Sequence, residues 1–175
     1  MQWLFDAFEA VRDFMELGGP VLTLIGWVIF AMWVMIVERL MYFRTGLKQI
    51  GQGVRDVWEA RSERKSWGAH RIREGMISEF SMAANTSVPV VQALVALCPL
   101  LGLLGTVTGM IEVFDVMALS GSGNARSMAS GVSKATIPTM AGMVGALSGV
   151  FLVTILTRRV EKEVEMLEDD LTMDH

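Results

Sequence analysis

The chain has 175 residues, 52% of them hydrophobic, and a mean hydropathy of +0.44. This composition argues against a soluble protein and is typical of an integral membrane protein. The formal net charge of −4 says little about partners, and we expect no nucleic acid among them. Three uncharged stretches take up so much of the length that we expect a single all-α membrane domain, residues 1–175, without a soluble catalytic domain.

The first element expected is an amphipathic helix over residues 1–17. Its apolar side chains fall on one side and four acidic residues largely on the other, which predicts a helix lying on the outer membrane face. Gly18-Gly19-Pro20 ends this helix and lets the chain turn into span one, because proline is tolerated in a first helical turn. Span one is placed at residues 20–41, with Glu38 and Arg39 as anchors at its inner interface.

A charged loop over residues 42–90 follows span one. Its apolar spacing predicts two helices, broken near residues 66–68, that extend spans one and two into the cytoplasm. Span two is placed at residues 92–116 and span three at residues 130–157, since both stretches are long enough to cross a bilayer. Residues 158–175 are expected to continue span three as a charged cytoplasmic tail.

The basic residues are distributed unevenly around these spans. Nine lie from Arg39, at the inner end of span one, to the beginning of span two. Arg158 and Arg159 close span three as inner-interface anchors, whereas Arg126 alone lies between spans two and three. The positive-inside rule then places the N-terminus outside and the loop and the C-terminus inside. This topology fits an odd number of spans.

Small residues recur at helical spacing in spans two and three. Those expected to let helices pack closely are Gly102, Gly105, Gly109, Gly142, Gly145 and Gly149, and they include two small-x-x-x-small motifs. A threonine, Thr106 or Thr139, lies near the middle of each uncharged stretch, where hydrocarbon favours leucine. Plain helix packing explains the glycines, whereas for the threonines packing and the lining of a polar path are equally good interpretations.

Spans two and three each carry a charge toward their outer ends. If Thr106 and Thr139 lie level in antiparallel helices, Glu112 is six residues further out and Lys134 five. At about 1.5 Å per residue both charges then lie roughly 8–9 Å further out, at similar depth. We expect them to form an ion pair; the alternative is that each extends separately to the interface.

The sequence contains no catalytic or cofactor-binding constellation. It has no nucleotide-binding loop, no serine with a plausible histidine and no carboxylate pair within the membrane. Cys98 is the single cysteine, and His70 and His175 have no ligand-like neighbours. We therefore expect no metal, no cofactor and no enzyme activity.

Two segments closely resemble signatures of one membrane-protein family. Pro99-Leu-Leu-Gly-Leu-Leu-Gly-Thr-Val-Thr-Gly-Met110 resembles the second-span signature of the MotA/TolQ/ExbB proton-channel family, and Ser130-Gly-Val-Ser-Lys-Ala-Thr-Ile-Pro-Thr-Met-Ala-Gly-Met143 resembles its third-span counterpart. The spacing of the threonines, the span count and the topology extend the resemblance over most of the chain. The short loop is more similar to ExbB than to MotA.

The resemblance implies a defined assembly. Family members form a ring, usually a pentamer, among the lipids of the bacterial inner membrane. The ring encloses the single spans of an ExbD-like partner, whose membrane aspartate carries the proton, and Thr106 and Thr139 are implied to face the pore beside it. Proton motive force then becomes motion that a TonB-like protein delivers to outer-membrane receptors. The alternatives are a TolQ-like stator for envelope maintenance and a passive helical scaffold.

One position departs from the family pattern. Where many ExbB and TolQ members carry a glutamate early in span three, this chain has Lys134, and its own acid, Glu112, lies near the end of span two. Such a swap across a facing pair preserves local neutrality. It puts a direct role for a third-span glutamate in doubt and supports the predicted pairing of the two residues.

Overall fold

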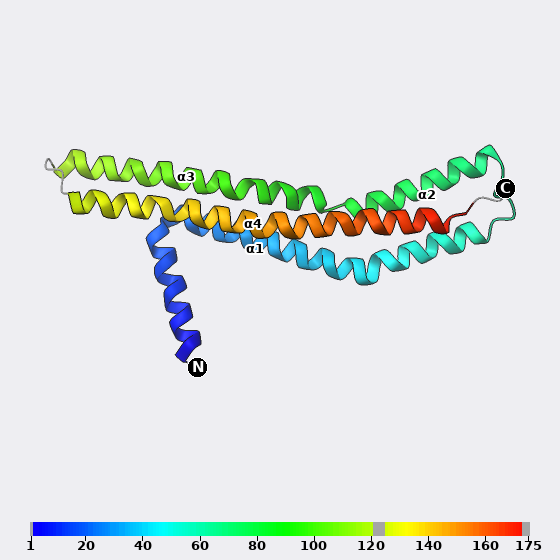
Figure 1. Ribbon diagram of the computed structural model, residues 1–175, viewed down its shortest axis with the longest axis horizontal. Helices are drawn as coiled ribbons and strands as arrows, with labels where there is room; N and C mark the ends of the chain where they lie inside the picture. The colour runs from blue at the N-terminus through cyan, green and yellow to red at the C-terminus, as the bar shows by residue number, and fades with distance from the viewer. Residues whose placement is uncertain (1, 121–124, 173–175) are drawn as a thin grey trace. The chain divides into compact units, whose positions relative to one another are not determined.

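A computed structural model of the chain describes residues 2–120 and 125–172. Within these residues all regular structure is helical, which confirms the all-α prediction. The helices are α1 (Gln2–Glu59), α2 (Trp67–Asn85), α3 (Val88–Ser120) and α4 (Ala125–Asp170) (Figure 1).

Three stretches of this helical chain are long and apolar enough to cross a membrane. They are Gly18–Glu59, Trp67–Leu119 and Met128–Asp170. The predicted spans at residues 20–41, 92–116 and 130–157 lie within them, so the three-span architecture is confirmed. One membrane crossing needs ~20 residues. Each stretch is longer than that, so part of each stretch extends beyond the hydrocarbon layer.

Helix α1 changes direction at a glycine near its beginning. Gly19 has φ 66° and ψ −164°, a backbone conformation that residues with a Cβ rarely adopt. Pro20 follows, and its missing N–H removes one hydrogen bond from the helical ladder. Before this kink, Phe8 is 71% exposed and Val11 60% exposed, so the apolar side of the N-terminal segment is unburied within the chain.

The chain divides into two compact units. The first unit comprises Met1–Trp33 and Ala93–Val150, and the second comprises Val34–Gln92 and Phe151–His175. The first unit thus holds the beginning of α1, most of α3 and the first half of α4. The second unit holds the rest of α1, all of α2, the beginning of α3 and the rest of α4.

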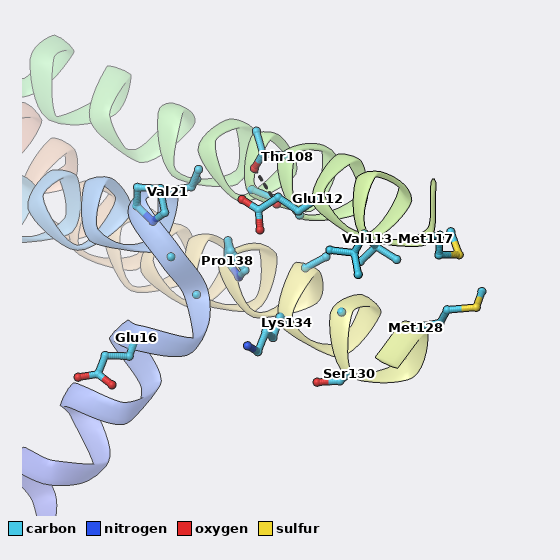
Figure 2. A pocket seen from close by; sticks show the side chains of 18 of the residues that line it. Glu16, Val21, Thr108, Glu112, Val113, Met117, Met128, Ser130, Lys134 and Pro138 are labelled. Atoms are coloured by element: carbon cyan, nitrogen blue, oxygen red, sulfur yellow. Dashed lines mark hydrogen bonds between the residues drawn. The ribbon is translucent and has the colours of Figure 1, made fainter. Parts of the chain in front are cut away.

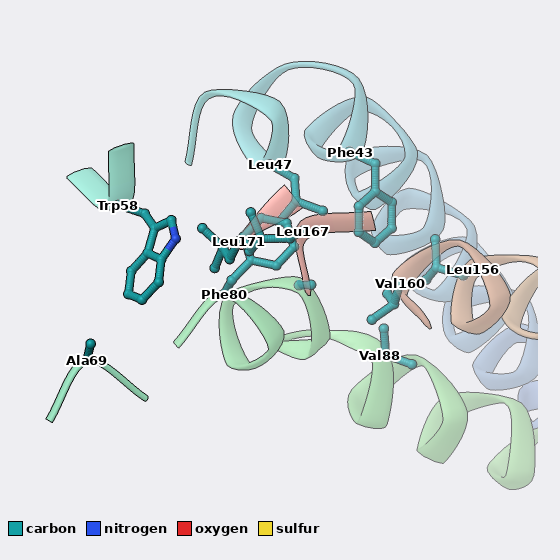
Figure 3. Packing of buried hydrophobic residues seen from close by; sticks show 11 residues of the cluster. Phe43, Leu47, Trp58, Ala69, Phe80, Val88, Leu156, Val160, Leu167 and Leu171 are labelled. Carbon is teal, nitrogen blue, oxygen red and sulfur yellow. The ribbon is translucent and has the colours of Figure 1, made fainter. Parts of the chain in front are cut away.

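One cluster of buried apolar side chains forms the core of the second unit (Figure 3). Its members, from all four helices and the residue after α4, are Phe43, Leu47, Trp58, Ala69, Phe80, Ala84, Val88, Leu156, Val160, Leu167 and Leu171. In the charged tail, apolar residues recur at helical spacing and form one face. Val160 and Leu167 belong to this face and are 2% and 1% exposed. The tail is therefore a packed helix, because α4 continues to Asp170 with this face buried.

Arginine side chains bind the end of α4 within the second unit. The last carbonyls of a helix have no partner within the helix. Arg73 supplies partners by donating from Nε to the carbonyl oxygen of Leu171 and from Nη2 to that of Glu168, both at 2.7 Å. Arg55 adds a 2.6 Å ion pair with Asp170.

The break between the two predicted loop helices lies at residues 60–66, just before the position that the sequence indicated. Ser66 caps α2, its Oγ accepting a 3.2 Å hydrogen bond from the N–H of Ala69. The Glu63 carboxylate accepts the N–H of Ser66 at 2.5 Å and the N–H of Lys65 at 3.0 Å. These hydrogen bonds, that of the Ser66 N–H foremost, hold the pKa of Glu63 below its usual value.

Replacing Trp58 by alanine tests the contribution of this core. The indole is 1% exposed, and its Nε1 donates a 3.0 Å hydrogen bond to the carbonyl oxygen of Thr172. We expect Trp58→Ala to lower the free energy of unfolding by about 3–5 kcal/mol, the usual loss for a buried aromatic side chain. Thermal unfolding of the purified protein in detergent, followed by circular dichroism, measures the change.

Trp67→Ala is the matched control, because the Trp67 side chain is 76% exposed. Its removal is expected to change the free energy of unfolding by no more than about 0.5 kcal/mol. Equal losses in the two variants would contradict the assignment of Trp58 to the core.

Candidate functional site

In the first unit, α3 and α4 run side by side and antiparallel with their backbones in close contact (Figure 1). A Cβ built on Gly102 would lie 2.9 Å from Cα of Thr139, and one built on Gly109 would lie 2.8 Å from Cα of Ala135. Real Cβ atoms essentially never approach a backbone atom so closely, so only glycine fits at these two positions. We call this contact the glycine seam, formed by Gly102, Gly105, Gly109, Gly131 and Gly142.

The predicted packing glycines serve two different contacts. Gly102, Gly105, Gly109 and Gly142 lie in the seam; a Cβ on Gly142 would meet the carbonyl oxygen of Cys98. Gly145 and Gly149 also face α1. A Cβ added to Gly145 would meet Ile29, and one added to Gly149 would meet both Val95 of α3 and the sulfur of Met32. The second small-x-x-x-small motif therefore packs α4 against α1 as well as against α3.

The two threonines make different hydrogen bonds. The Thr139 hydroxyl donates across the seam to the carbonyl oxygen of Gly102 at 2.8 Å. The Thr106 hydroxyl donates within its own helix to the carbonyl oxygen of Leu103 at 2.7 Å. Both hydroxyl protons are therefore engaged, and each oxygen keeps lone pairs that can accept a hydrogen bond.

Thr106 and Thr139 are offset along the seam. Gly102 contacts Thr139, Gly105 contacts Pro138 and Gly109 contacts Ala135, so Thr106 lies about one to four residues, ~2–6 Å, closer to the end of α3 at Ser120 than Thr139 does. The offset arises because the seam brings glycine, which has no side chain, opposite Thr139. A second threonine at that level would separate the two backbones.

A cavity of ≈ 990 Å³ opens in the first unit between α1, α3 and α4 (Figure 2). Thr108 and Ser130 line it with hydroxyl groups. Gly105 and Pro138 are the lining residues of α3 and α4 furthest from the connection between these helices. The cavity also has two side chains of each charge, contributed by Glu16, Glu112, Arg126 and Lys134.

Glu112 and Lys134 lie on opposite walls of this cavity (Figure 2). Lys134 adjoins Ala135, which packs on Gly109, and Glu112 adjoins Val113, which packs on Gly131. By these contacts the two charges differ in level by about two residues, ~3 Å. Among the described residues no ion pair joins them at 4.0 Å or less, so their pairing stays a prediction.

Arg39, which the sequence predicted as an inner-interface anchor, is buried within the second unit. It is 6% exposed, its Nη2 donates to Oγ of Ser87, and its guanidinium lies 5.0 Å from the centre of the Tyr42 ring. Ser87 lies in the joint between α2 and α3. Within the second unit Arg39 therefore connects α1 to this joint and does not extend outward. The other predicted anchors, Glu38, Arg158 and Arg159, are exposed.

Two parts of the site were missed from the sequence. Gly131 lies four residues before Ala135 and extends the seam against Val113, so small-residue spacing could have revealed it. Glu16 lies before the kink at Gly19 and lines the same cavity as Glu112. No local pattern connects residues so far apart in the sequence.

Replacing Gly102 by alanine tests the seam. The new Cβ would lie 2.9 Å from Cα of Thr139 and 3.0 Å from the carbonyl oxygen of Pro138, so the helices must separate. We expect a loss of about 1–3 kcal/mol in the free energy of unfolding, as for other overpacked interiors. The loss appears as a lower midpoint of thermal unfolding in detergent.

Gly75→Ala is the control, since Gly75 is also inside a helix but has no heavy atom within 4 Å of its built Cβ. Alanine there is expected to raise stability by about 0.5–1 kcal/mol. If both substitutions stabilised the protein, the seam would not be a close contact.

Comparison with known proteins identifies the family. The family model described as the MotA/TolQ/ExbB proton channel family matches residues 40–169, which is more than half of the chain. A putative biopolymer transport protein, ExbB-like 1, of Synechocystis is 37% identical over 79 residues, 43% of this chain and 31% of that relative. The biopolymer transport protein exbB1 of Vibrio cholerae is 34% identical over 88 residues, 50% of this chain and 39% of that relative.

The chain thus matches less than half the length of these relatives, and its matched stretches are similar to proteins named ExbB or ExbB-like. The match over residues 40–169 includes the glycine seam and both threonines. With its three apolar stretches, the chain is a multi-pass membrane protein that belongs to the MotA/TolQ/ExbB proton channel family.

Proposed function

We propose that this chain is the channel-forming subunit of a complex driven by the proton motive force. It acts as an ExbB-like protein with an ExbD-like single-span partner and, through a TonB-like protein, powers import across the outer membrane. The subunits form a ring, taken to be a pentamer, among the lipids of the bacterial inner membrane. The N-terminus lies in the periplasm and the C-terminus in the cytoplasm.

The observation that carries this proposal is the chemistry of the two uncharged stretches. Residues 80–111 and 135–157 contain hydroxyl groups, among them those of Thr106 and Thr139, but no carboxylate. A path lined by threonine alone has no titratable group that could relay a proton at mid-membrane. The proton carrier must therefore come from another chain, which is the role of the aspartate in an ExbD-like partner.

The hydrogen bonds of the threonines fit such a carrier. Because Thr139 donates to Gly102 and Thr106 donates to Leu103, both oxygens are left to accept. A protonated carboxylic acid has one O–H to donate, whereas a carboxylate has none. The two threonines thus stabilise the neutral, protonated form of a partner aspartate, the form that crosses low-dielectric surroundings at least cost.

The energy that drives such a complex comes from protons crossing the membrane. Each proton that crosses the membrane releases roughly 2.3 kcal/mol per 100 mV of potential, before the pH difference is added. The names of the similar proteins, which are biopolymer transport proteins, support the ExbB-like role over the TolQ-like alternative.

Valine substitutions test the proposed role of the threonines. Thr106→Val and Thr139→Val keep the shape of the side chain and remove the hydroxyl. In liposomes containing the chain and its single-span partner, each is expected to lower proton uptake about tenfold or more, the equivalent of one lost hydrogen bond. Thr136→Val is the control, because this exposed hydroxyl bonds only to the carbonyl oxygen of Ser133. Unchanged uptake in both test variants, with normal assembly, would support the passive-scaffold alternative.

Affinity purification from the native membrane tests the partners. Mass spectrometry of the co-purified proteins is expected to identify a single-span protein that carries a membrane aspartate, together with a TonB-like protein. Companions of the Tol and Pal type would select the TolQ-like role. A chain that purifies without any single-span partner would overturn the stator proposal.

A further inference from the structure

We propose that the cavity between α1, α3 and α4 is an aqueous vestibule within each subunit. It admits water from the outer face, in the proposed orientation, to a depth beside Thr106 and Thr139. A single chain supplies the residues that line this space. Its role in delivering protons rests on the proposed function; its hydration does not.

The depth of the cavity is the first argument. Glu112 directly follows the uncharged stretch 80–111, and Lys134 directly precedes the uncharged stretch 135–157. These charges therefore mark the level at which water must already be present, since an unhydrated charge in hydrocarbon costs at least about 2.5–3.5 kcal/mol. The cavity continues past them to Gly105 and Pro138. That is ~10 Å further along α3 and ~6 Å further along α4.

The end of the cavity adjoins the threonines. Gly105 immediately precedes Thr106, and Pro138 immediately precedes Thr139. The lining on α3 and α4 ends at these two positions, and beyond them Gly102 lies against Thr139. Water that enters from the Glu112 level therefore reaches Gly105 and Pro138, which are the sequence neighbours of the two threonines proposed to serve the proton carrier.

The walls are polar enough to keep the cavity wet. A buried water needs two to four polar partners, and an apolar cavity stays dry. This cavity offers Glu112, Lys134 and Glu16 together with the hydroxyls of Thr108 and Ser130 (Figure 2). At about 30 Å³ per molecule, its ≈ 990 Å³ corresponds to about 30 waters at bulk density.

The kink of α1 contributes to the same wall. Gly18, Gly19 and Pro20 line the cavity, as does Glu16. Pro20 has no N–H to give to the carbonyl of Glu16, so the helical ladder is interrupted at this wall. Interrupted backbone at membrane depth is tolerated where it borders a water-filled cavity.

Cysteine accessibility tests the vestibule. In a Cys98→Ala background, which has no other cysteine, Thr108→Cys places a thiol in the cavity. Val107→Cys is the matched control; Val107 is one residue away, is 51% exposed and does not line the cavity. A charged, membrane-impermeant methanethiosulfonate reagent is applied to the assembled complex in spheroplasts and in inverted vesicles.

We expect Thr108→Cys to react at least about tenfold faster than Val107→Cys, from the spheroplast side. The exposed fractions of these side chains in a single chain predict the opposite order of rates, because Thr108 is more buried than Val107. Equal rates would overturn the vestibule, and so would the absence of reaction at Thr108→Cys, which would mean that lipid or a second subunit fills the space. Reaction from inverted vesicles only would support the vestibule and contradict the proposed orientation.

The role in proton delivery has its own readout. After complete modification of Thr108→Cys, proton uptake by the complex is expected to fall about tenfold, while the same treatment of Val107→Cys leaves it unchanged. Labelling without any loss of uptake would keep the vestibule and overturn its part in proton delivery. Labelling in a complex that conducts no protons would refute the proposed function alone.

Discussion

The close backbone contact between α3 and α4 is the constraint on which the rest of the first unit depends. Where Gly102 meets Thr139, no side chain stands between the two helices, and this brings a hydroxyl within 2.8 Å of a carbonyl on the other helix. In hydrocarbon the helices gain nothing from the hydrophobic effect, so close packing and such cross-helix hydrogen bonds must hold them together. The levels of both threonines, and of the charges beyond them, follow from the register of this contact.

The contact between α3 and α4 borders a cavity along part of its length. The contact between α3 and α4 is close along the whole seam, and toward the connection between these helices Gly105, Gly109 and Gly131 also border a cavity with polar side chains, next to the kinked beginning of α1. Glycine, which has no side chain, thus has two effects here. It lets the backbones of α3 and α4 meet, and it leaves space beside them where α1 turns away.

The second unit shows how a largely charged segment packs into the fold. Its buried cluster takes side chains from all four helices, and Arg73 and Arg55 bind the end of α4. Arg39 lies in the same unit with its guanidinium on Ser87, at the joint that separates α2 from α3. A buried guanidinium is costly to leave without partners; besides Ser87, its Nε lies 3.9 Å from the Glu38 carboxylate.

Features that depend only on neighbouring residues could be predicted from the sequence. Long uncharged stretches determined the three spans, Gly18-Gly19-Pro20 determined the kink, and the spacing of Val160 and Leu167 determined a helical tail with a buried face. The motifs around Thr106 and Thr139 were sufficient for the family. The tertiary structure decided what depends on register and on distant residues. Thr139 is level with Gly102, Arg39 is buried against Ser87, and Glu16 shares a cavity with Glu112 and Lys134. No local pattern contains these facts, because helical periodicity shows which face a residue occupies but not the level at which two helices meet.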